Sequence, residues 1–475
     1  MTPHVLWTSA EAARATGGDS ATDWVAQGIS IDSRSVAPDD LFVALKGPTH
    51  DGHDFVEAAL AGGAAAAMVD HRPAALPDGA PLLLVQDTMD ALNGLGRAAR
   101  ARSNARIVGV TGSVGKTGTK EALRICLADQ GRTAASAASF NNQWGVPVSL
   151  ARMPRETDFG VLEMGMNHAG ELRALTGLVR PHVALITTVE AVHLEFFDSV
   201  AGIADAKSEI FEGLEPDGTA IIYRDSPYYA RMRAAAEACG AARILTFGRA
   251  AEADVRLIEA SLGAESSQVR ASVNGHDHDY VVGMSGEHWV TNSLAVLAVI
   301  AGLGADVAAA AHALSRLQPV KGRGQRREVP LAGGPFLLID ESYNANPTSV
   351  VAAIDVLGRA PVGHGGRRIA VLGDMLELGS EAAAFHVGLA ESIEAAGLDL
   401  VLTCGPEMAA LHAALPESRR GPHKPDSMAL IEDATALVAP GDTVMVKGSL
   451  GSRMAPIVEA LIALGEMPLR AANGE

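Results

Sequence analysis

The feature that most constrains this chain is a glycine-rich turn placed between an expected strand and an expected helix. Residues 106–110 (Arg-Ile-Val-Gly-Val) predict a short buried strand, and residues 121–127 predict an amphipathic helix. The intervening turn reads Thr-Gly-Ser-Val-Gly-Lys-Thr from Thr111 to Thr117. Glycines allow backbone N–H groups to close around phosphate oxygens, and the N-terminus of the following helix favours negative charge. The segment therefore predicts a phosphate-binding loop in an α/β fold.

The end of the loop indicates a nucleoside triphosphate as the ligand, and ATP is expected. The ammonium group of Lys116 can reach the terminal phosphates, and the hydroxyl of Thr117 can hold Mg²⁺. The full form of this loop has a further glycine where the chain has Val110, so the loop is a shortened form. The alternative is an ordinary strand-to-helix turn that contains glycines. The expected ATP-binding residues of the loop are Gly112, Ser113, Val114, Gly115, Lys116 and Thr117.

The length and composition of the chain predict several α/β domains. Its 475 residues exceed the size at which one hydrophobic core keeps growing, and we expect three domains. Hydrophobic residues make up 48% of the chain and aromatic residues only 4%, so the cores are expected to consist mainly of Ala, Val and Leu. Strand-like and helical runs alternate, which favours a mostly parallel central sheet. We expect domains at residues 1–102, 103–318 and 319–475.

The pattern of the chain changes in two places. Residues 254–282 alternate polar and apolar side chains, which predicts an antiparallel insertion before helices resume at Trp289. Residues 319–327 are basic, rich in glycine and without periodicity, which indicates a junction between domains. The expected strands elsewhere are 41–45, 82–85, 160–163, 183–187, 219–222, 336–340, 368–372 and 443–446, and the expected helices include 55–61, 201–211 and 347–357.

Charge and cysteine usage narrow the classes of partner and the compartment. A net charge of −18 argues against a nucleic-acid surface, which needs clustered positive charge. The 3 cysteines are too far apart for a zinc cluster or a disulfide framework. Residues 1–8 lack a secretory signal, and the apolar stretch 294–305 ends at Asp306 before it can span a bilayer. We therefore expect a cytoplasmic protein with small-molecule partners and no membrane or nucleic-acid partner.

Beyond the phosphate loop, several blocks of sequence resemble the Mur ligases, the ATP-dependent amide-forming enzymes of peptidoglycan synthesis. These blocks fall in the family's order and extend over all three expected domains. The resemblance implies a small N-terminal UDP-sugar-binding α/β domain, a central ATPase-like domain with a mostly parallel sheet, and a Rossmann-like C-terminal domain. The blocks are residues 32–36, 38–47 and 51–55 near the N-terminus, and 141–147, 163–166, 193–195 and 206–211 in the central domain.

Two further blocks, residues 340–347 and 372–379, resemble the branch of this family that adds a dipeptide. The neighbouring branch, which adds the third amino acid, usually carries an Asp-Asn-Pro-Arg motif that this sequence lacks. The resemblance thus implies ligation of D-alanyl-D-alanine to UDP-N-acetylmuramoyl-tripeptide through an acyl phosphate, with release of ADP and phosphate.

The resemblance also implies binding residues for each substrate. It places the UDP-sugar against Ser33, Arg34, Asn141 and Asn142. It places the far side of the nucleotide against Asn292, Arg323 and Asp340. An amide can both donate to and accept from a base, and an arginine can reach phosphate. The dipeptide is expected to meet Tyr343, Asn344 and Asp374, with Lys447 and Ser449 as further candidates.

For the metal, the resemblance implies two Mg²⁺ ions held by Thr117, Glu163, His193 and Lys207. It further implies that Lys207 is carbamylated by CO₂, which converts a cation into a carboxylate-like anion. Lys116, Lys207 and His193 are the expected catalytic residues. Mg²⁺ prefers oxygen ligands, so a structural role for His193 stays open. An exposed lysine without a role on its helix is likewise the alternative for Lys207.

Rival functions are another ligase on the same scaffold, such as a folylpolyglutamate synthetase or a cyanophycin-type enzyme, a regulatory nucleotide switch, and a non-catalytic UDP-sugar-binding protein. No motif identifies the third residue of the tripeptide, which is meso-diaminopimelate or lysine. The base that removes the proton of the amine is also open. We expect a monomer, although no motif reports the oligomeric state.

Overall fold

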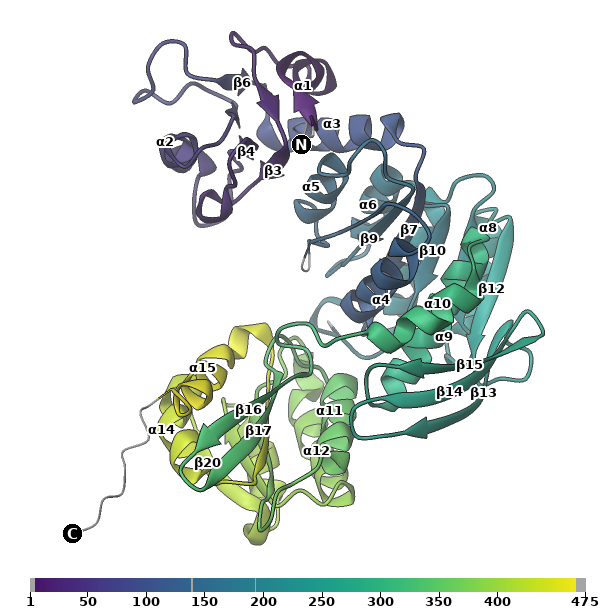
Figure 1. The fold of residues 1–475 in the computed structure, drawn as a ribbon, viewed down its shortest axis with the longest axis vertical. Coiled ribbons are helices and arrows are strands. Elements are labelled where there is room, and N and C mark those ends of the chain that lie inside the picture. Colours follow the sequence, from purple (N-terminus) through teal and green to yellow (C-terminus); the bar gives the residue numbers. More distant parts are fainter. Residues whose placement is uncertain (1–4, 138–139, 193, 467–475) are drawn as a thin grey trace.

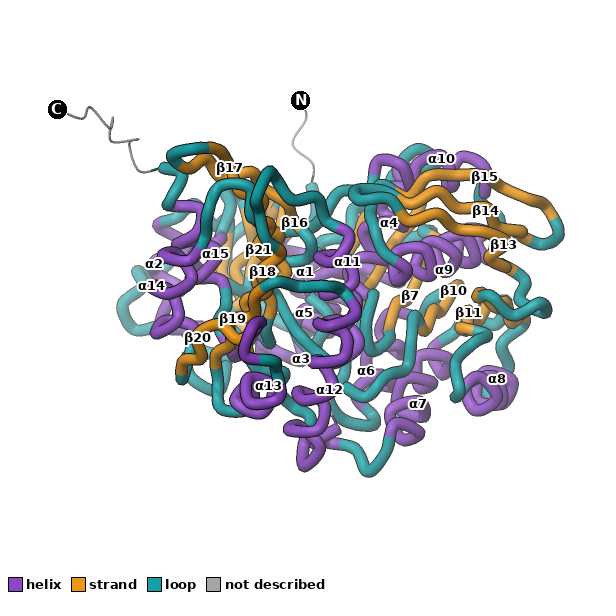
Figure 2. Tube along the Cα trace, turned by 90° about the horizontal axis from the view of Figure 1, so that it is seen from below, coloured by secondary structure: helices purple, strands orange, loops and turns teal. Residues whose placement is uncertain are grey.

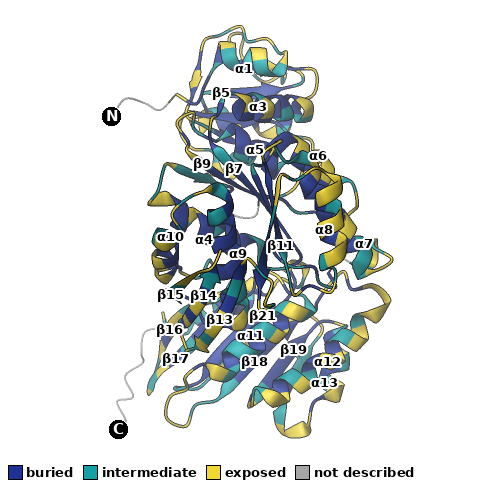
Figure 3. Ribbon diagram, turned by 90° about the vertical axis from the view of Figure 1, so that its right-hand side faces the viewer, coloured by how far each residue is buried: buried dark blue, intermediate teal, exposed yellow. Residues whose placement is uncertain are grey.

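The computed structural model describes residues 5–137, 140–192 and 194–466, and these form three large sheets in succession, with a small two-stranded sheet beside the first (Figure 1). The first sheet lies at one end, the second in the middle and the third at the other end. Buried strands and outward-facing helices alternate in each, as Figure 3 shows by its dark strands and yellow outer helix faces. This is the α/β arrangement that the sequence predicts.

The N-terminal sheet is parallel, with the strand order β3-β4-β5-β6. Its helix α1 begins with a capping box, in which the side chains of Thr8 and Glu11 satisfy each other's backbone N–H groups. The bounds are β3 Gly28–Ser30, β4 Asp40–Val43, β5 Ala66–Val69, β6 Leu82–Leu84, α1 Ser9–Thr16, α2 Val56–Ala61 and α3 Thr88–Arg102, with the small pair β1 Trp7–Thr8 and β2 Val25–Ala26 beside them.

Helix α3 joins this region to the next one. It packs on α5 (Gly145–Ala151), and the indole N–H of Trp7 donates to the carbonyl of Ala151 at 2.9 Å. Gly96 of α3 approaches Pro147 so closely that a Cβ would lie 3.3 Å from its Cα. The first two regions therefore share a packed core rather than a loose linker.

The central sheet has the strand order β15-β14-β13-β12-β11-β10-β7-β9-β8. Strands β7 to β12 are parallel to their neighbours, and each pairs in a continuous register. The strand bounds are β7 Arg106–Thr111, β8 Thr133–Ala135, β9 Phe159–Glu163, β10 Val183–Ile186, β11 Thr219–Tyr223, β12 Arg243–Gly248, β13 Val255–Leu262, β14 Ser267–Val273 and β15 His276–Val282. The parallel strands are apolar on both faces because helices cover both.

Helices α4, α9 and α10 pack on one face of the central sheet, and α5 to α8 pack on the other. Their bounds are α4 Lys116–Ala128, α6 Glu171–Val179, α7 Val200–Ser208, α8 Tyr229–Ala238, α9 Glu287–Leu303 and α10 Val307–Ala313. The antiparallel strands β13, β14 and β15 extend one edge (Figure 2), which confirms the prediction for residues 254–282.

The C-terminal sheet has the order β16-β17-β21-β18-β19-β20 and is parallel apart from β16. Helices α11, α12 and α13 cover one face, and α14 and α15 cover the other. The bounds are β16 Gln325–Leu331, β17 Gly334–Glu341, β18 Arg368–Gly373, β19 Leu400–Cys404, β20 Arg420–Lys424, β21 Thr443–Lys447, α11 Pro347–Arg359, α12 Ala382–Ala395, α13 Met408–Ala414, α14 Ser427–Leu437 and α15 Ala455–Ala463.

The structure departs from the sequence interpretation at the junction 319–327. Residues from Gln325 onward already belong to the edge strand β16, which pairs antiparallel with β17. Backbone pairing creates this strand, and its polar side chains lie largely at the surface, so periodicity did not reveal it. None of the helices in the described ranges combines the length and the apolar character of a membrane span.

Candidate functional site

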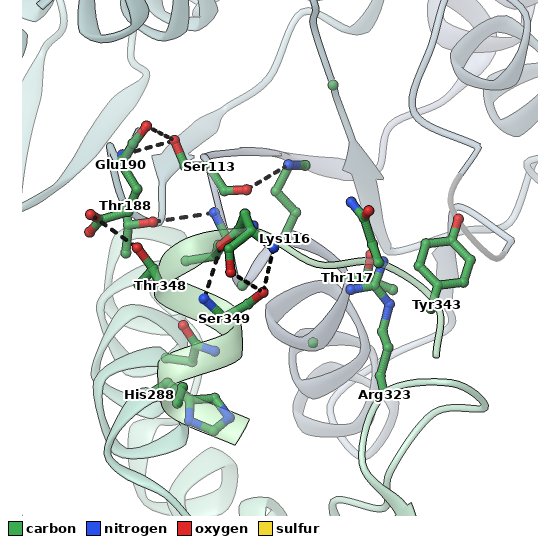
Figure 4. Close-up of a pocket in the computed structure, with 18 of the residues that line it drawn as sticks. Ser113, Lys116, Thr117, Thr188, Glu190, His288, Arg323, Tyr343, Thr348 and Ser349 are labelled. Carbon is green, nitrogen blue, oxygen red and sulfur yellow. Dashed lines mark hydrogen bonds between the residues drawn. The ribbon is translucent and has the colours of Figure 1, made fainter. Parts of the chain in front are cut away.

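A cavity of about 1430 Å³ lies where the carboxyl ends of strands from two sheets meet. Residues that follow β7, β9 and β10 of the central sheet line it, together with the ends of β17 and β21 and the first turns of α11. Ligands of open parallel sheets bind at this end of the strands. The close-up in Figure 4 shows the loop after β7 facing α11 across this space.

The loop after β7 has the backbone geometry of a phosphate cradle. Gly112 and Gly115 have φ angles of 148° and 85°, which side chains rarely tolerate. A Cβ on Gly112 would also lie 1.9 Å from Oγ1 of Thr187. Helix α4 begins directly after Gly115, so its free N–H groups point into the loop. Val110 is a buried residue of β7, and the shortened motif therefore reflects a strand that continues further toward the loop.

Within the described residues, the hydrogen bonds that Lys116 donates go to its own loop. Its Nζ lies 2.6 Å from the carbonyl oxygen of Gly112 and 3.4 Å from that of Ser113. Burial lowers the pKa of Lys116, the carboxylate of Glu163 raises it, and Arg323 lowers it further. Carbonyl oxygens carry only partial charges, so a phosphate group would be a stronger partner for this ammonium.

The segment after β10 holds the loop in place. Ser113 donates its N–H to the carbonyl of Thr188 at 2.9 Å, and its hydroxyl accepts the N–H of Glu190 at 2.9 Å. Val114 donates its N–H to Oγ1 of Thr188 at 3.3 Å. These contacts fix the loop before any ligand arrives, which reduces the entropy lost on binding.

Glu163 at the end of β9 fits a divalent cation. Its side chain is 1% exposed, Oε1 accepts a hydrogen bond from Nδ2 of Asn141 at 2.8 Å, and the buried Oε2 has no partner in the described chain. A buried carboxylate oxygen without a donor is costly unless a cation binds it. Thr117 lines the same cavity and offers a hydroxyl. These oxygen ligands suit Mg²⁺.

The predictions for Lys207 and His193 can be checked to different extents. His193 lies outside the described residues. Lys207 is 2% exposed on α7, so the alternative of an exposed lysine is wrong. Burial lowers the pKa of Lys207 well below its usual value, and the nearby charge of Lys116 lowers it further. Lys207 is not among the residues that line the cavity, although its amine lies close enough to Lys116 to feel its charge.

The residues expected on the far side of the nucleotide are only partly brought together. Asn292 of α9 approaches the loop so closely that a Cβ on Gly115 would lie 2.8 Å from its Oδ1. The guanidinium of Arg323 stacks on the ring of Tyr343 at 4.2 Å, and both line the cavity. Asp340 does not: its carboxylate accepts from the N–H groups of Gly322 and Ser342 and fixes the chain entry to this region.

In the C-terminal region, Lys447 and Asn344 line the cavity and contact each other. Nζ of Lys447 donates to the carbonyl of Asn344 at 3.0 Å and to Oε2 of Glu341 at 3.2 Å. Asp374, expected as a dipeptide ligand, is instead 4% exposed and accepts the N–H of Met408 at 2.8 Å. Asp374 follows β18 and contacts the first residue of α13 from this distant segment, and its predicted role in dipeptide binding stays a prediction.

The residues predicted for the UDP-sugar are divided between two places. Asn141 and Asn142 line the cavity, and Asn142 also caps α5 by accepting the N–H of Gly145 at 2.9 Å. Ser33 and Arg34 lie in the N-terminal region, away from the cavity lining, and exposed Arg34 pairs with Asp32 at 2.7 Å. Their predicted role in UDP binding stays a prediction.

The cavity residues that sequence reasoning missed include Thr188, Glu190, Trp289 and Thr348. Glu190 reaches across the site, where its Oε2 lies 3.4 Å from the hydroxyl of Thr348 on α11. Burial raises the pKa of Glu190, against a smaller lowering by Thr348. Trp289 lies one helical turn before Asn292, and this spacing was a signal that could have identified it.

Comparisons with known proteins find relatives that match most of the chain. Three family models match in order: "Mur ligase family, catalytic domain" over residues 25–100, "Mur ligase middle domain" over 110–300, and "Mur ligase, glutamate ligase domain" over 322–450. A relative from Escherichia coli (strain K12), named UDP-N-acetylmuramoyl-tripeptide--D-alanyl-D-alanine ligase, is 38% identical over 91% of this chain and 93% of its own length. A relative of the same name from Bacillus subtilis is 35% identical over 94% of each chain.

Solved structures give the same result. A crystal structure of MurF from Acinetobacter baumannii superposes with a TM-score of 0.82 at 30% identity, covering 96% of this chain and 99% of its own. MurF from Thermotoga maritima in complex with ADP gives 0.75 at 28% identity, covering 92% and 98%. These comparisons do not bear out the carbamate expected on Lys207, and we describe that residue as an amine.

Proposed function

The chain belongs to the Mur ligase family and has its three-domain α/β fold, and we propose that it is the ATP-dependent ligase that joins D-alanyl-D-alanine to UDP-N-acetylmuramoyl-tripeptide. One observation carries the proposal. A phosphate loop with Lys116, a metal-ready carboxylate at Glu163 and C-terminal residues such as Asn344 and Lys447 all line a single cavity. A ligase of three substrates requires such a shared space.

The first step transfers a phosphoryl group. A carboxylate oxygen of the tripeptide attacks the γ-phosphorus of ATP, the bond from the γ-phosphorus to the β,γ-bridging oxygen breaks, and ADP leaves. In the proposed geometry the N–H groups of the loop bind the β-phosphate, and Lys116 stabilises the charge that develops on the transferred group. The product is an acyl phosphate, which has a good leaving group on its acyl carbon.

The second step forms the amide. The neutral amine of D-alanyl-D-alanine attacks the acyl carbon, and the tetrahedral species expels phosphate while nitrogen gives up its proton. Contacts between Glu190 and Thr348, and between the backbones of Glu195 and Glu377, join the central region to the C-terminal region. They hold the two regions together around the cavity in which the acyl phosphate is proposed to form.

Thr117 and Glu163 are the residues proposed to hold Mg²⁺, since both offer oxygen ligands and Glu163 has an unpaired buried oxygen. The bound cation supplies charge neutralisation at the phosphoryl oxygens. His193 stays the proposed ligand of a second ion. Asn141 orients Glu163 through the 2.8 Å hydrogen bond to Oε1, so the proposed contact of Asn141 with the UDP-sugar would share its side chain with the metal site.

Lys207 enters the proposal as a buried amine next to Lys116. Burial lowers the pKa of Lys207, and the nearby charge of Lys116 lowers it further, which is the direction that reduces repulsion between the two lysines. Removing CO₂ from the buffers and restoring bicarbonate tests this assignment. A rate that stays constant supports the amine, and a rate that depends on bicarbonate assigns a carbamate instead.

Phosphate release under steady-state conditions tests the ligase function. ATP and Mg²⁺ are supplied with UDP-N-acetylmuramoyl-tripeptide alone, with D-alanyl-D-alanine alone, and with both. We expect sustained release only with both substrates, because each turnover consumes one carboxylate and one amine. Sustained release with ATP alone would contradict the proposal and favour a nucleotide switch. Tripeptides that end in meso-diaminopimelate or lysine, tested in parallel, identify the third residue.

The proposal also includes the domain limits 1–102, 103–318 and 319–475, a monomeric state and a cytoplasmic location. The small-molecule substrates support the last point, since UDP-linked precursors and ATP are soluble anions. Sedimentation equilibrium of the full chain, at concentrations used in the assay, tests the monomer.

A further inference from the structure

The first turn of α9 carries a tryptophan that the proposed reaction does not use. Trp289 lies three residues before Asn292, so the two side chains project from the same face of the helix. Both line the cavity that contains the phosphate loop. Trp289 is only partly buried, so its ring keeps exposed surface that a residue of the core does not have.

The indole lies directly against the helix that follows the phosphate loop. A Cβ on Gly118 of α4 would lie 2.6 Å from Cη2 of Trp289 and 3.1 Å from Cζ3. One turn along α9, Asn292 has the same relation to Gly115. The first two turns of α9 therefore run along the start of α4, and the indole lies within about one helical turn of the phosphate cradle.

The polar edge of the indole is not used by the protein. No hydrogen bond from Nε1 of Trp289 is made to the described parts of the chain, whereas buried Trp7 donates to Ala151. The neighbouring ring of His288 lies 5.8 Å away at 46°, and His288 also lines the cavity. Aromatic faces beside a phosphate site are the surfaces on which nucleotide bases stack.

We propose that Trp289 contacts the base of the bound nucleotide and supplies affinity that does not depend on the identity of the base, while Asn292 supplies the selective hydrogen bonds. This inference rests on the proposed binding of the phosphates at residues 112–117. Stacking tolerates every base because each has a π face. An amide, by contrast, distinguishes donors from acceptors on the base edge.

Calorimetry with two ligands tests the inference without catalysis. ADP carries phosphates and a base, whereas tripolyphosphate carries phosphates alone. We expect Trp289→Ala to weaken ADP binding about tenfold or more and to change tripolyphosphate binding by less than about twofold. Trp289→Phe keeps an aromatic face and is expected to restore most of the ADP affinity. A purely structural role for Trp289 would weaken both ligands together.

Fluorescence gives an independent readout. ADP should quench tryptophan emission in the parent and in Trp24→Phe, which replaces an indole in the N-terminal region, and the quenching should disappear in Trp289→Phe. Equal ADP affinity in the parent and in Trp289→Ala would overturn the inference. Failure of the parent to bind either ADP or tripolyphosphate would instead contradict the proposed function, so the two failures are distinguishable.

Discussion

Two lysines, one in the central region and one in the C-terminal region, line the same cavity, yet their partners differ. Lys116 follows β7 and donates only to loop carbonyls, while Lys447 ends β21 and pairs with the carboxylate of Glu341. Lys116 forms no ion pair with a carboxylate in the described ranges. A lysine without an ion pair is available to a phosphate, whereas a paired lysine stabilises the loop around it.

The comparison teaches that the sequence neighbourhood of a lysine does not define its task. Both lysines have a nearby glycine and a nearby hydroxyl residue. The difference arises from Glu341, which ends the neighbouring strand β17 in register with Lys447. Strand β9, next to β7, ends in Glu163, but there the carboxylate has Asn141 as its partner and keeps one oxygen free.

The largest expected effect comes from Lys116→Ala. Removing the ammonium takes away stabilisation of the transferred phosphoryl group, and we expect the steady-state rate of ligation to fall by about 100-fold or more. The thermal midpoint should change little, because Lys116 contacts only carbonyls of its own loop. A Lys116→Ala mutant that ligates at the rate of the parent would contradict the proposed role of Lys116 in phosphoryl transfer.

Lys447→Met should act on stability instead. It leaves the Glu341 carboxylate and the Asn344 carbonyl without their donor, and we expect the free energy of unfolding to fall by about 2–3 kcal/mol. Urea denaturation measures this loss. The matched double variant with Glu341→Gln should recover part of it, since the unpaired charge is then absent. A single variant as stable as the parent would contradict the structural role.

The pH dependence of the free energy of unfolding tests the environment of Lys447, because His288 lies near this lysine and titrates according to its charge. Burial lowers the pKa of His288 to about 4, and the charge of Lys447 contributes to the lowering. Between pH 6.5 and pH 4 the unfolded state binds the proton and the folded state does not, so stability falls as the pH falls. We expect His288 to contribute about 2 kcal/mol of the loss between pH 7 and pH 5.

Urea titrations of the parent and of His288→Gln at both pH values isolate this contribution, because all other titrating groups are shared. The loss between pH 7 and pH 5 should be smaller in the variant. If the parent and the variant lose the same stability between pH 7 and pH 5, the pKa of His288 is not lowered by folding. That result would contradict the proposed effect of the Lys447 charge on His288.

The smallest expected effect comes from Asn141→Ala. This variant removes the hydrogen bond that holds the carboxylate of Glu163, the acidic residue near Lys116. Without the hydrogen bond to Oε1, the carboxylate is free to rotate, and we expect the Mg²⁺ concentration for half-maximal activity to rise about tenfold. Mn²⁺ binding measured by electron paramagnetic resonance should weaken in parallel. If instead only the KM for the UDP-linked substrate rises, Asn141 serves the sugar and not the metal.

Much of the fold and part of the site were predictable because their signals are local. The apolar runs gave β7, β9, β10 and β11 within about two residues, as expected for buried parallel strands. Strand β16 was missed because backbone hydrogen bonds to β17 form it, and its mostly polar side chains show no apolar pattern in the sequence. The hydrogen bond that Asp374 accepts from the N–H of Met408, 34 residues away, could not be predicted from the sequence, and the predicted role of Asp374 in dipeptide binding stays a prediction.

By itself, the sequence determined the phosphate loop and the α/β class. Each depends on residues that are close in the chain. Only the tertiary structure decided which lysine is paired, which oxygen of Glu163 is free and which aromatic ring lies beside the loop. The reason is physical: these properties depend on partners such as Glu341, Asn141 and Gly118, which folding brings together from distant segments.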